Sequence, residues 1–143
     1  MGNQKQLQIF RRSTRLERDG TGEGLSGYIP TPRGLELLGQ LLDALASNDY
    51  KAFSVTGPYG SGKSSFAVFL SALFEPRTSS AHQAALSLLE AESGPMARSV
   101  QAMRERFGVG ETGFVVVKVT AQRAPLLTIL REALASALGQ LAD

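Results

Sequence analysis

The chain has 143 residues, of which 43% are hydrophobic and 20% are charged, and its formal net charge is +2. This composition is typical of a soluble globular protein, and the length allows at most one domain with its own core. The absence of cysteine excludes disulfides and thiolate metal sites, and no apolar run approaches the ~20 residues needed to span a bilayer, so we expect a cytoplasmic protein without a membrane segment.

Residues 1–27 are predicted to form an N-terminal arm that combines basic residues with a glycine-rich end. The basic side chains all precede residue 20 and are Lys5, Arg11, Arg12, Arg15 and Arg18. A basic arm can contact the phosphates of nucleic acid, which makes DNA a candidate partner. The sequence favours the alternative of a solvated tail, because no interleaving of aromatic residues supports base stacking.

A first helix is predicted to begin at Thr31 and Pro32, which have the preferences of an N-cap and of a first helical residue. Leucines then recur at helical spacing on one face, at Leu35, Leu38, Leu42 and Leu45. The polar residues 47–49 are expected to end this helix.

The most informative part of the sequence follows this helix. Residues 52–56 are apolar and predicted to form a short buried strand, and residues 64–74 are predicted to form a helix. Between them, residues 57–64 read G-x-x-x-x-G-K-S, the Walker A phosphate-binding loop. A strand, a glycine loop and a helix in this order are the context that supports the motif. The sequence therefore predicts binding of a nucleoside triphosphate with Mg²⁺, and the alternative is a degenerate loop that holds no nucleotide.

Each residue type in this loop has a physical role in holding phosphate. The glycines have no Cβ, so the loop can curl and its N–H groups can point inward. Lys63 is expected to reach the β- and γ-phosphates and is the catalytic candidate, while the Ser64 hydroxyl is expected to ligate Mg²⁺. Ser65 is expected to donate its backbone N–H to the α-phosphate. The predicted binding set is Gly57, Pro58, Tyr59, Gly60, Ser61, Gly62, Lys63, Ser64 and Ser65.

The second half of the chain continues the alternation of elements. Helices are predicted over 81–92, 96–107 and 126–141, with a loop over 108–113 and a valine-rich strand over 114–119. His82 is expected to be a solvated helix residue, and the arginines of the 96–107 helix, Arg98, Arg104 and Arg106, are placed on its outer face. Alternating strands and helices predict an α/β fold of the P-loop NTPase type, with three layers and parallel strands.

A working phosphate-loop NTPase also needs a Walker B strand that ends in an acid, and no segment of this sequence has that pattern. Two parallel strands cannot cover themselves. We therefore expect residues 28–143 to be the N-terminal part of an NTPase domain that is cut before the Walker B strand. The alternative is a short, catalytically inactive relative.

Residues 27–33, the leucine helix and residues 53–67 resemble the start of large bacterial ATPases of the AAA+/STAND type. The greatest similarity is to ATP-binding proteins of phage-defence and restriction islands. The likeness covers 27–74 well and 114–141 more loosely, and only the glycine loop is specific. It implies ATP as the nucleotide, an ATPase that couples ATP to conformational change, and a homo-oligomer or a larger parent chain.

The resemblance also implies that Tyr28, Ile29 and Pro30 line an adenine pocket, for which a surface turn packed on the core is an equal alternative. Arg77 and Arg123 are candidates for phosphate-facing arginines, although surface positions are favoured for both. Two further functions stay open: a P-loop small-molecule kinase, and a non-catalytic nucleotide-binding assembly module.

Overall fold

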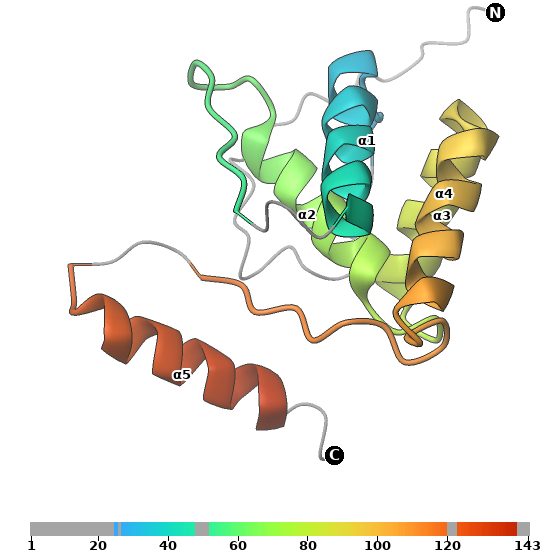
Figure 1. Cartoon of the computed structure of the whole chain (residues 1–143). Helices are drawn as coiled ribbons and strands as arrows, with labels where there is room; N and C mark the ends of the chain where they lie inside the picture. Colours follow the sequence, from blue (N-terminus) through green and yellow to red (C-terminus); the bar gives the residue numbers. More distant parts are fainter. Residues whose placement is uncertain (1–24, 26, 48–51, 120–122, 140–143) are drawn as a thin grey trace, which may run out of the picture.

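The computed structural model of the chain describes residues 25, 27–47, 52–119 and 123–139 (Figure 1). These residues form five helices, which are α1 (Pro32–Ser47), α2 (Lys63–Phe74), α3 (Ser80–Glu92), α4 (Gly94–Arg106) and α5 (Leu126–Gly139). Of the predicted N-terminal arm, only Leu25 and Gly27 are described, and Leu25 is buried in the core. Within the part of the chain that is described, no helix has the length and apolar character to cross a membrane.

The prediction of an α/β fold with parallel strands is wrong, because the described residues contain helices and no strand. Both predicted strands lie in irregular structure, at residues 52–58 and 114–119. In the segment 114–119, the one backbone hydrogen bond to other described residues runs from the Phe114 N–H to the Phe74 carbonyl, at 2.8 Å. Apolar, β-branched runs fit a pleated, covered surface, but they form strands only when another strand pairs with them.

The helix predictions are confirmed with small shifts at the ends, except for positions 140 and 141 of the last predicted helix, which lie outside the described residues. Helix α1 begins at Pro32, and the Thr31 hydroxyl accepts a hydrogen bond from the Gly34 N–H at 3.1 Å, as its predicted capping role requires. Helix α4 begins two residues earlier than predicted, because Pro95 occupies its first turn and the Ser93 side chain caps it.

Helices α1 to α4 enclose one hydrophobic core. Helix α2 contacts α3, α3 contacts α4, and α4 contacts α1, while α5 lies apart from this group (Figure 1). The largest fully buried side chains are Phe69, Leu38, Leu73, Leu89, Val68 and Val100. Three of them belong to α2, so the helix that follows the glycine loop is also the central element of the core.

Candidate functional site

The glycine loop curls at the N-terminal end of α2, at the edge of the molecule (Figure 1). A turn closes it, in which Ser61 N–H donates to the Pro58 carbonyl at 3.3 Å. Gly60 and Gly62 have φ values of 79° and 82°, a left-handed conformation that other residues adopt at a cost of roughly 1–2 kcal/mol. Tyr59, at the tip of the loop, is almost fully exposed. The loop is thus accessible to a ligand and has the backbone that its glycines predict.

The Lys63 ammonium group lies inside this curl. It donates to the Gly57 carbonyl at 2.8 Å and the Pro58 carbonyl at 2.7 Å, and more weakly to the Ser61 hydroxyl at 3.3 Å. The first residues of the loop are therefore folded back onto the lysine that follows it. Gly57 permits this closure, since a Cβ there would lie 3.1 Å from the Ser61 hydroxyl oxygen.

Helix α2 starts directly after the loop. The N-cap residue is Gly62, which has no side chain to cap the helix. The first hydrogen bond of the helix runs from the Phe66 N–H to the Gly62 carbonyl at 2.9 Å. In the first turn of a helix the backbone N–H groups point toward the N-terminal end, where the helix dipole is positive. Ser64 is exposed in this first turn and Ser65 is half-buried. Lys63 and Ser64 thus follow one another in the first turn of α2, and a lysine, a hydroxyl and the amides of a helix start are groups that suit phosphate oxygens.

A magnesium ion at this point would have one side-chain ligand from the predicted set, Ser64. In the described ranges, no three His, Cys, Asp or Glu residues are grouped closely enough to hold a metal ion. Several groups of the loop can therefore contact phosphate, whereas only the Ser64 hydroxyl can ligate Mg²⁺. The remaining ligands of the ion would come from the nucleotide and water.

The opposite end of α2 is held by Arg104, which was expected on the outer face of its helix and is instead only 2% exposed. Its guanidinium donates to the Leu73 and Glu75 carbonyls, both at 2.9 Å, and to the Gly110 carbonyl at 3.1 Å. The Leu73 and Glu75 carbonyls lie at the end of α2, where carbonyls have no partner within the helix and the helix dipole is negative. The Gly110 carbonyl belongs to the loop that follows α4. The signal in the sequence was the spacing, because Arg104 follows Val100 by four residues on the apolar face.

His82 lies beside Arg104 and is buried, so the expectation of a solvated histidine is wrong. Its Nδ1 lies 3.2 Å from the Leu73 carbonyl, which also accepts from Arg104. Burial, and then the charge of Arg104, lower the pKa of His82 below its ordinary value, which favours the neutral imidazole. His82 and Arg104 therefore both hold the C-terminal end of α2 through the Leu73 carbonyl.

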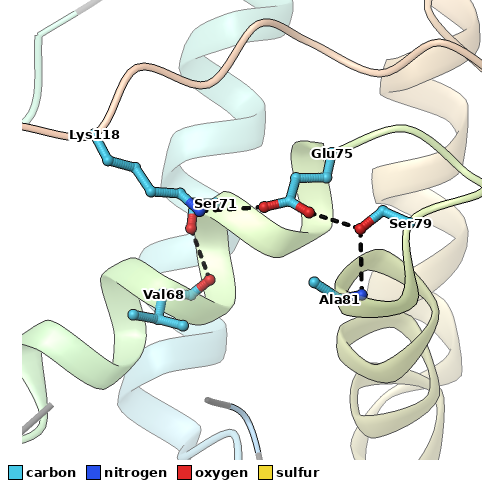
Figure 2. Close-up of polar contacts among 6 residues, drawn as sticks. All are labelled: Val68, Ser71, Glu75, Ser79, Ala81 and Lys118. Atoms are coloured by element: carbon cyan, nitrogen blue, oxygen red, sulfur yellow. Dashed lines mark hydrogen bonds and ion pairs between the residues drawn. The ribbon is translucent and has the colours of Figure 1, made fainter. Parts of the chain in front are cut away.

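A polar cluster fastens the segment 114–119 to the same helix end (Figure 2). Lys118 forms an ion pair with Glu75 at 3.2 Å, and the other carboxylate oxygen of Glu75 accepts from the Ser79 hydroxyl at 2.7 Å. Both members of the ion pair are about one-fifth exposed, at 21% and 20%. Ser79 in turn caps α3 by accepting from Ala81 N–H at 3.2 Å. The cluster joins α2, α3 and the predicted valine strand, and its role is to hold them together.

The candidates for an adenine pocket lie in a turn before α1. The ring of Tyr28 packs on Phe69 with centroids 4.9 Å apart, and burial raises the pKa of its hydroxyl. Pro30 is buried, whereas Ile29 is exposed. This arrangement matches the alternative of a turn packed on the core.

The two candidate arginines are not gathered at the glycine loop. Arg77 follows α2 at its far end and pairs with Glu111 at 3.0 Å. The twelve residues of α2 separate it from Lys63 by about 18 Å at 1.5 Å per residue. Arg123 is an exposed residue before α5. The structure therefore brings together the predicted loop residues, and it leaves both arginines elsewhere.

Comparison with known proteins adds no relative to this description. No protein-family profile, no curated protein and no solved structure matches the chain significantly. The functional argument therefore depends on the geometry at the start of α2.

Proposed function

We propose that residues 57–65 bind the phosphates of a nucleoside triphosphate, ATP in the first instance, together with Mg²⁺. The observation that carries this proposal is the placement of the Lys63 ammonium group inside the curl of the glycine loop, 2.7–2.8 Å from two of its carbonyls. These two contacts hold the ammonium group within the loop. Enclosed at the start of α2, it concentrates positive charge where a polyphosphate would meet the helix amides.

The three contacts of Lys63 differ in strength, and the difference supports binding. An ammonium group has three N–H donors. The two carbonyl contacts are short, while the contact to the Ser61 hydroxyl is long, at 3.3 Å, and is the one most easily exchanged. A phosphate oxygen replacing that hydroxyl would gain a charge-assisted bond without opening the loop.

The space around the loop is compatible with a ligand. A Cβ placed on Gly60 or on Gly62 would meet no atom within 4 Å. Left-handed residues within a curled loop turn successive N–H groups toward one concave side, which is how such loops hold anions. Gly60 and Gly62 thus supply the backbone geometry, Lys63 the charge, and Ser64 a hydroxyl in the first turn of α2.

Bound Mg²⁺ would neutralise phosphate charge and bridge phosphate oxygens. Among the described residues, no strand ends in the carboxylate that orders Mg²⁺ and the attacking water in such ATPases. The proposal therefore assigns nucleotide binding to this chain, as the nucleotide-binding part of an ATPase that couples ATP to conformational change. A binding module in which the nucleotide is a structural ligand is the second candidate, favoured by the firm anchoring of α2 through Arg104.

Replacing Lys63 with alanine is expected to weaken binding of a fluorescent ATP analogue by at least tenfold. The variant loses charge-assisted bonds to phosphate, which contribute roughly 1.5–3 kcal/mol each. Binding is measured by titration with Mg²⁺ present, and folding is checked by circular dichroism. The matched control is Arg98→Ala, which removes an exposed positive charge from α4 and should bind as the original chain does. Equal affinity of Lys63→Ala and the original chain would refute the assignment.

Replacing Ser64 with alanine is expected to reduce the dependence of binding on Mg²⁺. The original chain should bind the analogue more tightly with Mg²⁺ than with excess chelator, and the variant should show a smaller ratio because it lacks the hydroxyl ligand. Ser87→Ala is the control, since Ser87 is also an exposed helix serine but lies in α3. An unchanged Mg²⁺ ratio in Ser64→Ala would show that this hydroxyl does not ligate the ion.

A further inference from the structure

Helix α5 exposes an apolar face that is independent of the glycine loop. None of its residues is buried, although most are apolar. Five of its leucines are between 45% and 70% exposed: Leu126, Leu127, Leu130, Leu134 and Leu138. Four of them recur at i, i+3, i+7 and i+11 from Leu127, so they form one stripe along the helix.

This helix needs a partner to be stable. Isolated helices shorter than about 12–15 residues are marginal in water, and most helices gain their stability by packing an apolar face. Helix α5 has 14 residues, and its side chains are either exposed or only half-buried in the described chain. The surface that remains to be covered is the leucine stripe.

We infer that the stripe packs against the same stripe of a second copy of this chain, forming a two-fold dimer through α5. In a two-fold contact each surface meets itself, so a strongly charged surface would repel its copy. The described part of α5 carries one positive and one negative side chain, Arg131 and Glu132, and is therefore electrically self-compatible. Leucines spaced three and four residues apart are the pattern with which two helices interlock.

The apolar area around the stripe is consistent with packing against a second copy of the chain. The four leucines of the stripe and the neighbouring Leu126, which are 45–70% exposed, form a patch on the order of 500 Å², at the upper end of what a single chain usually exposes. Two such patches bury on the order of 1,000 Å² in total, which is where specific interfaces begin.

Cysteine cross-linking tests the dimer directly, because the chain has no cysteine of its own. In the full chain, Leu134→Cys places a single thiol on the stripe, and Ser136→Cys places one on the opposite side of the same helix. Under mild oxidation we expect Leu134→Cys to form a disulfide-linked dimer at least tenfold faster than Ser136→Cys. Equal rates for the two variants would overturn the proposal.

Sedimentation of the cysteine-free chain gives a second, independent readout. We expect a concentration-dependent dimer that Leu130→Glu converts to a monomer, while Ser136→Glu, the matched charge on the far side, leaves it dimeric. Circular dichroism and thermal melting establish that both variants remain folded. A chain that is monomeric at all concentrations up to ~100 μM would overturn the dimer and would leave the nucleotide proposal unaffected.

Discussion

Replacing Arg104 with methionine is expected to lower the free energy of unfolding by about 3 kcal/mol or more. The substitution keeps most of the side-chain volume and removes the guanidinium that binds the Leu73, Glu75 and Gly110 carbonyls. Hydrogen bonds to a charged group contribute roughly 1.5–3 kcal/mol each, and carbonyls left buried without a partner add a cost of the same order. Urea denaturation followed by circular dichroism at 222 nm measures the change.

Two comparisons identify the cause of that loss. Arg106→Met removes a charge from the same last turn of α4 at an exposed position, and it should change stability by no more than about 0.5 kcal/mol. Arg104→Lys keeps the charge but lacks the planar fork that reaches separate carbonyls, so it should fall between the original chain and Arg104→Met. If Arg104→Met and Arg106→Met are equally stable, the guanidinium does not anchor α2.

The helices could be predicted because the signals for a helix depend on residues that are close to it in the sequence. The leucine spacing of α1, the cap at Thr31 and the break near Ser93 each depend on neighbouring residues, and the structure has these features within two residues of their predicted positions. The turn of the glycine loop and the contacts of Lys63 are also local, since they lie within residues 57–63, while the binding of phosphate by this loop stays a prediction.

The predicted strands failed because a strand is defined by a partner distant in sequence. Valines at 115–117 and the apolar run at 52–56 are equally compatible with extended chain that no other strand joins, and this is how the structure describes them. Arg104 and His82 were misplaced for a related reason. The spacing of Arg104 from Val100 does place it on the apolar face of α4. Its carbonyl partners at the end of α2, which make burial of a guanidinium favourable, lie about 30 residues away, and no local pattern reveals them.

Replacing Gly113 with alanine is expected to be far more destabilising than the same change at Gly108. Both glycines have left-handed φ values, 70° and 69°, so both variants incur the roughly 1–2 kcal/mol that a Cβ costs in this conformation. They differ in their surroundings. A Cβ on Gly108 would meet nothing within 4 Å, whereas one on Gly113 would lie 2.5–2.6 Å from the backbone of Glu75 and Pro76.

Backbone atoms cannot rotate away as the end of a long side chain can, so Gly113→Ala must displace the segment that follows it. That displacement breaks the hydrogen bond from Phe114 N–H to the Phe74 carbonyl and separates Lys118 from Glu75. Overpacking typically adds 1–3 kcal/mol, so we expect Gly113→Ala to exceed Gly108→Ala by about 2 kcal/mol or more in urea denaturation. The close approach at Gly113 therefore acts together with Arg104 to fix the end of α2 that is distant from the glycine loop. Equal losses of stability in the two variants would mean that the segment from 113 to 119 is not held against α2.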